Sequence, residues 1–474
     1  MISLIFIAMV AFLFLTLYLV NKFVKKDSTA IAVSNWILII ASYMFVIYAD
    51  WRFAAVLAFV SVSTWYFGKQ QKGTTAGIVI ALLALAFFKY TNFFAQSFAK
   101  LFGNDYTALG IILPLGISFY TFSAIGYLID IKRGKISPAS FAEVVLYLSF
   151  FPKITSGPIA KSADFFAQTG SRRALDSKCF SAGIQIFAFG LFKKIVLADR
   201  LSVFVNQVYA TPKAFGSLTV FLAVIAYSFQ IYFDFSGYSD MAIGSAKVLG
   251  FDLPRNFNLP YLSHNVTELW KRWHITLSSW LQEYLYISLG GNRKGTARTY
   301  LNLVLTMVLG GLWHGANWTF IIWGLLHGLA LAVHKLWMNV TKSPSKQHGA
   351  LANAVSTVLT FLFTSFCWIF FRAQSFDRAL EIISRIFAFK AGVEQPYMWL
   401  FVSLAVFIVC CIFAAKKSLS QKPALKKLNQ SYISGYYPVL DLTKFWSLVA
   451  FFVFCGLILC LAYTGGSPFI YGNF

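Results

Sequence analysis

Long apolar runs separated by short polar links are the dominant pattern of this sequence. In the first third they lie near residues 2–20, 31–49, 53–68, 76–98 and 109–131. A helix of about 20 apolar residues crosses the roughly 30 Å hydrocarbon core of a bilayer. The run 2–20 lacks the alternating segments of about ten residues that form a membrane barrel. Because backbone amides in lipid must be paired internally, the runs are predicted to be membrane-spanning helices.

Further runs continue this pattern to the end of the chain. They lie near 180–198, 216–236, 300–312 continuing into 317–337, 351–371, 397–415 and 445–463. Together the runs predict about eleven membrane crossings. One or two more helices are expected to lie at the interface or to re-enter the membrane. No composition shift, repeat or low-complexity tract marks a boundary, so residues 1–474 are predicted to form one all-α polytopic membrane domain.

Basic residues are unevenly distributed among the links. In the first third every second link carries them, at 22–26, 69–72 and 132–135. Under the positive-inside rule these links are cytoplasmic, which places the N-terminus outside. The same rule puts the basic link Lys416–Lys427 inside and the tail Gly465–Phe474 outside.

The formal net charge of +23 comes from 40 basic and 17 acidic residues. In a soluble protein such a balance would suggest a nucleic acid, but here the basic residues flank apolar runs, where anionic lipids attract them. No nucleic-acid recognition motif accompanies them. The lipid bilayer is therefore the predicted partner, and no nucleic acid is expected.

The stretch between about 251 and 299 differs from its neighbours, since its apolar runs are broken by Trp, Tyr, Arg and Asn. Asn265 followed by Glu268 indicates a helix start. The helix that follows would place an apolar stripe on one side and basic residues elsewhere, as in a helix that lies at the interface or lines a cavity. The members of the stripe are Trp270, His274, Leu277 and Leu281.

His314 is the strongest candidate for chemistry on sequence pattern. It lies in the segment GGLWHGANW, where three glycines within six residues favour a bend between two apolar runs. Irregular backbone at membrane depth persists only where it is buried in protein or lines a cavity. A neutral imidazole there can accept a proton from a hydroxyl nucleophile. The alternative is a histidine that hydrogen-bonds a neighbouring helix.

The other polar groups near the membrane are weaker candidates. His274 and His327 could serve the site or simply pack in the interior, whereas His264, His334 and His348 are expected to be structural or solvated. Asp234, Asp240, Glu268 and Asn317 could orient an imidazole or donate to a substrate carbonyl. A metal site of three histidines has no support from their spacing, so no metal is expected. No serine-hydrolase elbow, phosphate-binding loop or dinucleotide fingerprint occurs.

Two segments carry long motifs: Asn256–Gly295 (NFNLPYLSHNVTELWKRWHITLSSWLQEYLYISLGGNRKG) and Leu309–His327 (LGGLWHGANWTFIIWGLLH). Further blocks lie at Leu113–Gly134, Phe150–Pro158, Tyr232–Gly244 and, in the tail, Ser467–Tyr471. Together they resemble the bacterial branch of the membrane-bound O-acyltransferase family, whose members acetylate alginate or peptidoglycan. The resemblance covers nearly the whole chain.

The resemblance implies a ring of helices around a central tunnel in a bacterial inner membrane. His314 of the WHG motif would be catalytic, with His274 as the second polar residue. Supporting or tunnel-lining residues would be Asn317, Trp313, Asp240 and Trp270. The acyl donor, expected to be acetyl-CoA, would approach from the cytoplasm, and no permanently bound cofactor is expected. The acceptor would be an extracytoplasmic glycan, reached directly or through a partner acetyltransferase or glycan-binding protein that the tail would meet.

Several alternatives stay open at this point. A transporter or flippase for an envelope precursor would use the same polar groups without covalent chemistry, although it should show internal symmetry, which the sequence lacks. A scaffold in an envelope complex would explain the tail but not the polar groups at membrane depth. Acetyl is not distinguished from other acyl groups such as D-alanine. His314 could act as a general base or as a transient acyl acceptor.

Overall fold

The computed structural model of the chain describes residues 4–341, 349–420, 439–465 and 470, with the side chains of 414–420 excepted. The tail Gly465–Phe474 and the basic link Lys416–Lys427, both singled out by charge, lie largely outside the described residues. The chain divides into two compact units, interleaved in sequence. Unit 1 comprises residues 1–187 and 241–254, and unit 2 comprises 188–240 and 255–474.

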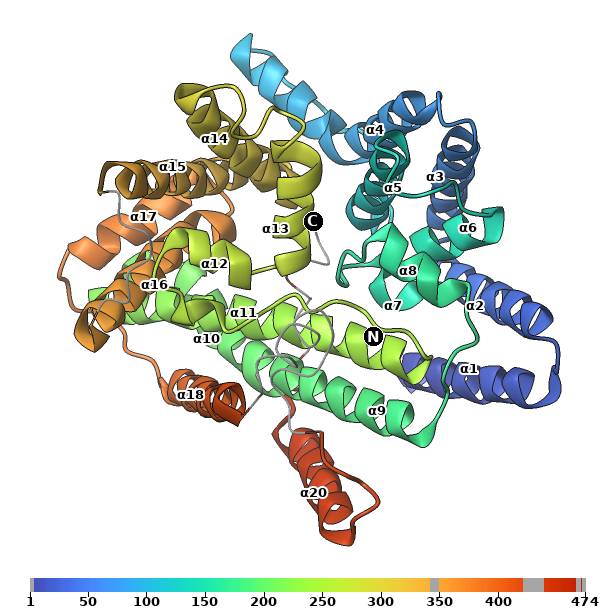
Figure 1. Cartoon of the computed structure of the whole chain (residues 1–474). Coiled ribbons are helices and arrows are strands. Elements are labelled where there is room, and N and C mark those ends of the chain that lie inside the picture. The colour runs from blue at the N-terminus through green and yellow to red at the C-terminus, as the bar shows by residue number, and fades with distance from the viewer. Residues whose placement is uncertain (1–3, 342–348, 421–438, 466–469, 471–474) are drawn as a thin grey trace. The chain divides into compact units, whose positions relative to one another are not determined.

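Unit 1 is built from the helices that follow the first apolar runs (Figure 1). They are α1 (Leu4–Phe23), α2 (Asp27–Ala49), α3 (Trp51–Lys69), α4 (Thr74–Leu101), α5 (Ile117–Lys132), α6 (Phe141–Ser149), α7 (Phe151–Ile154), α8 (Ser162–Thr169) and most of α9 (Ser177–Leu191). The predicted run 109–131 becomes helical only at Ile117, because Pro114 and the left-handed Gly116 precede the helix.

Unit 2 begins within α9 and contains most of α11 (Ser217–Val248). Its other helices are the π-helix η1 (Phe192–Ala198), α10 (Asp199–Ala210), η2 (Pro212–Ala214), η3 (Pro260–Leu262), α12 (Val266–Arg272), α13 (Ile275–Trp280), the π-helix η4 (Leu281–Tyr286), α14 (Thr296–His314), α15 (Trp318–Thr341), α16 (Ala350–Arg372), α17 (Phe376–Phe387), α18 (Met398–Ser420) and α20 (Phe445–Leu461). Across the described ranges the β-structure amounts to one isolated bridge, between Phe215 and Val393.

Seven described helical segments are long and apolar enough to cross a membrane. They are Leu4–Phe23, Asp27–Ala49, Thr74–Leu101, Ser177–Ala210, Ser217–Val248, Trp318–Thr341 and Ala350–Arg372. The shorter apolar helices Met398–Phe413 and Phe445–Leu461 follow. The predicted all-α polytopic membrane class is confirmed, whereas the count of about eleven crossings, the central tunnel and the single domain stay predictions.

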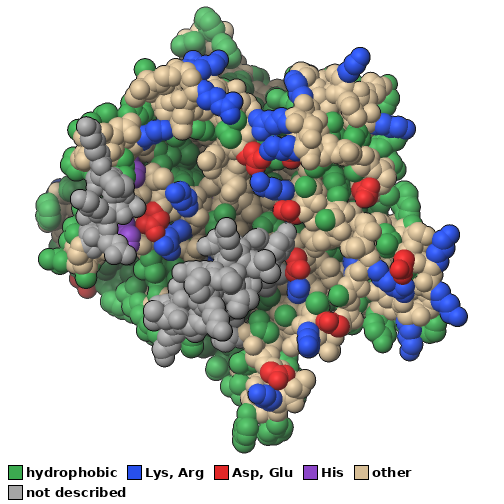
Figure 2. All heavy atoms as spheres, in the orientation of Figure 1, with side chains coloured by type: hydrophobic (Ala, Val, Ile, Leu, Met, Phe, Trp, Pro, Cys, Tyr) green, Lys and Arg blue, Asp and Glu red, His purple; other side chains and the backbone are tan. Residues whose placement is uncertain are grey.

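Large apolar side chains lie exposed along these helices, as expected where lipid replaces water. Phe12, Trp36 and Phe98 are among them. On the face drawn in Figure 2, hydrophobic side chains reach the surface over wide areas. Lys and Arg side chains are spread over the same face, with fewer Asp and Glu. Such a surface fits a protein whose helices are solvated by hydrocarbon and whose links meet charged headgroups.

Two glycine pairs bring α9 and α11 into close antiparallel contact. In unit 1, a Cβ atom on Gly244 would lie 2.6 Å from the carbonyl oxygen of Gly183. In unit 2, a Cβ atom on Gly237 would lie 2.7 Å from the carbonyl oxygen of Gly190. Small residues at a helix crossing let backbones approach closely, which is the main source of helix association in membranes.

Helices α14 and α15 form an antiparallel hairpin, so the prediction of one glycine-broken span over 300–337 is wrong. A Cβ atom on Gly311 would lie 2.2 Å from the carbonyl oxygen of Phe320, and one on Gly324 would lie 2.3 Å from that of Met307. Gly328 faces Val304 in the same way. The chain turns back at Gly315 because glycines on both helices let the two backbones touch along their length.

Unit 1 contains a buried lysine without a carboxylate partner among the described residues. Lys153 on α7 is 5% exposed, and its ammonium group lies 4.3 Å from the ring centroid of Tyr147 and 5.4 Å from that of Phe165. A small cavity lined by Tyr120 and Ser123 borders it. Burial lowers the pKa of Lys153 to about 7.

Candidate active site

The predicted interfacial helix is interrupted at His274, so its continuity was predicted wrongly. Helix α12 ends at Arg272, Trp273 is extended, and His274 has a left-handed φ of 41° before α13 starts. The segment around Asn256 takes over backbone pairing here, since its carbonyl accepts from the Ile275 amide at 2.8 Å. The stripe itself is confirmed, because the four residues Trp270, His274, Leu277 and Leu281 are all buried.

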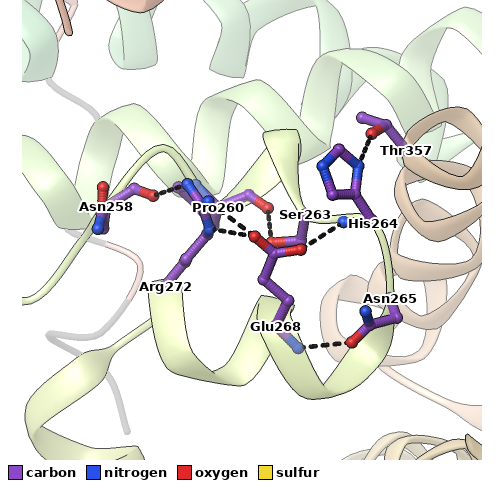
Figure 3. A network of polar contacts seen from close by, with 8 residues as sticks. All are labelled: Asn258, Pro260, Ser263, His264, Asn265, Glu268, Arg272 and Thr357. Atoms are coloured by element: carbon purple, nitrogen blue, oxygen red, sulfur yellow. Dashed lines mark hydrogen bonds and ion pairs between the residues drawn. The ribbon is translucent and has the colours of Figure 1, made fainter. Parts of the chain in front are cut away.

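The start of α12 is fixed by a polar network (Figure 3). The side chain of Asn265 accepts from the Glu268 amide at 2.8 Å, which confirms the predicted cap. The Glu268 carboxylate accepts from the His264 amide at 2.9 Å and pairs with Arg272 at 2.7 Å. The ring of His264 hydrogen-bonds Thr357 at 2.8 Å. His264 and Glu268 therefore build the helix start, as the sequence suggested for His264.

His274 is completely buried at the break between α12 and α13. Its Nδ1 lies 3.3 Å from Oδ1 of Asn256, while Nε2 has no hydrogen-bond partner within the described chain. The Asn256 amide is oriented in turn, because its Nδ2 donates to the Ser239 hydroxyl at 3.2 Å. Burial lowers the pKa of His274 to about 3, so the ring is neutral near pH 7. With Nδ1–H donating to Asn256, Nε2 is left as an acceptor.

His314 occupies the last turn of α14, directly before the hairpin turn, and is 2% exposed. Aromatic rings surround it: the ring centroids of Trp313, Trp323 and Phe371 lie 5.0, 5.1 and 5.3 Å from its own. Trp313 also faces His274 at 6.4 Å between ring centroids. The structure therefore places both predicted catalytic histidines next to the same tryptophan.

A third buried histidine joins this group. His327 on α15 has no exposed surface, and its ring centroid lies 5.1 Å from that of Trp323 and 5.2 Å from that of Trp270. We call the six residues Trp270, His274, Trp313, His314, Trp323 and His327 the Trp–His cluster. The sequence motifs do not place His327 in the predicted site, because a lone imidazole in an apolar run belongs to no motif. Its position inside a predicted membrane span was the one feature that could have indicated a functional role.

Asn317 and Asp240, both predicted supporting residues, make their recorded contacts elsewhere. The Asn317 side chain accepts from the Thr319 amide at 3.0 Å and donates to the Gln374 carbonyl at 3.1 Å, so it caps α15. Asp240 pairs with Lys193. These partners give both residues a structural role, and their supporting or tunnel-lining role stays a prediction.

A second buried polar group lies on η1, α10 and α11 of unit 2. Lys194 pairs with Asp199 at 2.7 Å and with Asp234 at 2.6 Å, and Asp234 also accepts from the Ile470 amide at 2.8 Å. Together with the Lys193–Asp240 pair, these contacts place two adjacent lysines against three carboxylates. Buried charges are tolerated when they are paired in this way, so the group is structural on its geometry.

A cavity of about 570 Å³ borders the Trp–His cluster. Its walls are mainly apolar and include Trp270, Leu281, Met307, Leu331 and Met338. Its polar lining includes Lys271, His334, Lys335 and Asn292, and no acidic residue belongs to it. Because the charged lining is basic only, this cavity, which we call the basic pocket, suits a ligand with an anionic group and a long, weakly polar body.

A metal centre has no support in the described residues, where no three His, Cys, Asp or Glu side chains come close enough to hold an ion. The site consists instead of buried imidazoles embedded in aromatic rings. Such rings exclude water and favour proton transfer between uncharged groups over charge separation.

Comparison with known proteins defines the class. The family described as MBOAT, membrane-bound O-acyltransferase family, matches residues 53–373. That match covers most of the chain and includes the whole Trp–His cluster. The chain belongs to the membrane-bound O-acyltransferase family and is a multi-pass membrane O-acyltransferase, as the resemblance implied.

Individual relatives point to one branch of the family. A protein named "Probable alginate O-acetylase" from Azotobacter vinelandii is 35% identical, over 93% of this chain and 94% of the relative. A peptidoglycan O-acetyltransferase from Helicobacter pylori is 39% identical, over 65% of this chain and 63% of the relative. A teichoic acid D-alanyltransferase from Streptococcus thermophilus is 29% identical over 49% of this chain and 59% of the relative. Membership of an enzyme family removes the basis for the transporter alternative.

Proposed function

We propose that the protein transfers an acetyl group from acetyl-CoA on the cytoplasmic side of a bacterial inner membrane to hydroxyl groups of an extracytoplasmic polysaccharide. The acceptor would be of alginate or peptidoglycan type, reached directly or through a partner protein. The names of the more similar relatives support acetyl over D-alanyl transfer. The observation that carries the proposal is the position of His314, which is buried among aromatic rings and shares its neighbour Trp313 with His274.

His314 would act as the general base. Its imidazole takes the proton of the acceptor hydroxyl while the oxygen attacks the thioester carbonyl carbon. The C–S bond then breaks, and the proton passes to the departing thiolate, so that free CoA and an O-acetyl ester result. A transient acyl-imidazole on His314, broken by the same hydroxyl, remains the alternative course. In both courses His274 stays neutral and contributes an acceptor nitrogen near the reacting groups.

The basic pocket would receive the donor. CoA combines phosphate groups with a long, weakly polar arm, and the pocket combines lysines with apolar walls. Lys335 is steadied by Asn292, whose Oδ1 accepts at 2.7 Å. The positive-inside rule supports cytoplasmic access, because the basic residues Arg293, Lys294 and Arg298 flank the first turn of α14.

The test uses purified full-length protein in detergent or vesicles with radiolabelled acetyl-CoA. Release of free CoA and transfer of label to alginate or peptidoglycan fragments are measured for the wild type, His314→Ala and the control His264→Ala. We expect His314→Ala to lose about 10²–10⁴-fold in transfer rate, while the control, changed at the start of α12, keeps the wild-type rate.

Equal transfer by wild type and His314→Ala would leave the acyltransferase activity but move the base to another residue, with His274 next. No transfer by the wild type to either glycan, with a co-purified partner supplied, would count against the proposed donor and acceptor.

A further inference from the structure

The buried imidazole of His327 in unit 2 carries polar atoms whose burial costs folding free energy. It has no exposed surface, and neither ring nitrogen has a hydrogen-bond partner among the residues that the structure describes. A neutral imidazole carries one N–H donor and one acceptor nitrogen. Leaving both unpaired costs free energy that an aliphatic side chain of similar size would not cost. The ring is therefore suited to a polar partner that the described chain does not supply.

Its two tryptophan neighbours share this property. The indole nitrogens of Trp270 and Trp323 are buried and likewise lack partners in the described part of the chain. The ring centroids of Trp270 and Trp323 lie 5.7 Å apart, and each is within 5.2 Å of the His327 ring centroid. Three adjacent side chains thus hold three N–H donors and one acceptor nitrogen that are all unpaired.

Trp270 connects His327 and Trp323 to the basic pocket. It belongs to the pocket wall and contacts His327 edge to face at an interplanar angle of 86°. Trp323 continues the path, since its ring centroid lies 5.1 Å from that of His314. No hydrogen bond within the described chain holds the Trp270 indole, so packing alone opposes its rotation. A ligand that enters the pocket and displaces Trp270 would contact its neighbours His327 and Trp323, and Trp323 is in turn a neighbour of His314.

We propose that His327, with the indole N–H groups of Trp270 and Trp323, binds an amide group of the acyl donor's arm and so positions the thioester at His314. An amide matches the group, because its carbonyl accepts from an indole or imidazole N–H and its N–H donates to the acceptor nitrogen. The phosphopantetheine arm that carries such amides is common to CoA and to acyl carrier proteins. This inference rests on the proposed function and makes His327 a positioning residue.

The test measures binding by full-length protein in detergent, with radiolabelled CoA as one probe and a phosphopantetheinyl carrier protein as another. His327→Leu should raise the Kd for both probes by about tenfold or more. Its melting temperature should equal or exceed that of the wild type, because the variant removes unpaired polar atoms. His327→Gln keeps a donor and an acceptor and should retain most of the affinity. His264→Leu, changed at an exposed ring, is the control for the substitution itself.

Kinetics separate positioning from a structural role. With acetyl-CoA, His327→Leu should raise KM more than it lowers kcat, whereas transfer from S-methyl thioacetate, which has no amide, should be equal in variant and wild type. Unchanged Kd values in a stabilised His327→Leu would mean that a buried water pairs with the ring, and would overturn the inference.

The outcomes also separate this inference from the proposed function. Wild type that binds the carrier protein but not CoA, with affinity lost in His327→Leu, would refute acetyl-CoA as donor and uphold the role of His327. Wild type that binds neither probe would refute both the donor class and the inference.

Discussion

Asn256 orients His274 from outside the helices that carry the site. Its Oδ1 lies 3.3 Å from Nδ1 of His274 and accepts from the Thr276 hydroxyl at 2.6 Å. Its backbone carbonyl accepts from the Ile275 amide. One residue therefore fixes the left-handed backbone of His274, the position of its ring and the nitrogen that carries the proton.

Replacing Asn256 should reduce catalysis through His274. Asn256→Leu removes the acceptor of Nδ1–H and leaves the ring unpaired, so we expect kcat to fall about tenfold or more. Asn256→Asp, which keeps an acceptor oxygen, should retain more activity than the leucine variant. Acetyl transfer measured beside Asn339→Leu, an exposed position near the end of α15, checks the result. Equal loss in the Asp and Leu variants, each with a lowered melting temperature, would indicate a structural role only.

The buried His274 should also make the free energy of unfolding depend on pH in the acidic range. Its pKa is about 3 in the folded protein and about 6.5 when unfolded, so the unfolded chain binds the extra proton between these values. The free energy of unfolding should therefore fall as pH drops from about 6.5 toward 3, by up to about 1.4 kcal/mol per unit. Unfolding in detergent at pH 7, 5 and 4 should show a shallower decline for His274→Gln than for wild type. Parallel declines would contradict the assignment.

Lys153 should make the free energy of unfolding depend on pH in the alkaline range instead. Its pKa of about 7 in the folded protein lies below the unfolded value of 10.5, so burial destabilises the fold fully below pH 7. The wild type should gain stability as pH rises from about 7 to 10, by up to about 1.4 kcal/mol per unit. Lys153→Met should be more stable than wild type at pH 7 and should lose this dependence, as measured by thermal unfolding in detergent. A destabilised Lys153→Met would show that an ionic partner pairs with the amine.

Helices α14 and α15 touch at Gly311, Gly324 and Gly328, which we call the glycine seam. This seam should not tolerate even one added methyl group. Gly324→Ala would place a Cβ atom 2.3 Å from the Met307 carbonyl oxygen, so we expect a loss of about 1–3 kcal/mol or more. Gly456→Ala in α20, where nothing lies within 4 Å of the new Cβ, is the matched control and should be neutral or stabilising. Melting temperatures in one detergent compare the two. Similar values would mean that α14 and α15 can separate without cost.

The pairing of Asp240 with Lys193 tests whether this carboxylate is structural. Asp240→Ala removes the carboxylate that pairs with the buried Lys193 ammonium, and we expect a loss of about 3–5 kcal/mol in stability. The double variant Lys193→Met, Asp240→Leu should recover most of that loss and retain acetyl transfer. A stable double variant without activity would support the supporting role in the site that the resemblance implied for Asp240.

Sequence patterns correctly predicted the structural features that depend only on residues close together in the chain. The alternation of apolar runs and basic links identified a polytopic helical protein, and the spacing of Trp270, Leu277 and Leu281 identified a buried face. The cap at Asn265 also followed from adjacent residues. Each of these features is decided within one or two helical turns, where periodicity is informative.

Features that depend on distant partners were missed or misread. The break at His274 needs the carbonyl of Asn256, 18 residues upstream in the sequence, and periodicity alone favours a continuous helix. The glycines near His314 predicted a bend, but the full reversal of the chain between α14 and α15 also depends on Gly324 and Gly328 in the following helix. Asp240 pairs with Lys193 only after η1 and α11 pack. His327 shows its unpaired nitrogens only once its surroundings are known.

The glycine seam of α14 and α15 divides the hairpin into a fixed part and a variable part. Backbone contact at Gly311 and Gly324 sets where His314 lies, and no side chain takes part in that spacing. Leu303, Leu331 and Met338 line the pocket from the same two helices and are not among the residues of these glycine contacts. If the pocket receives the donor as proposed, substitutions at these positions would change which donor fits while His314 keeps its place. A scaffold of this kind allows substrate preference to diverge by ordinary point mutation without rebuilding the catalytic centre.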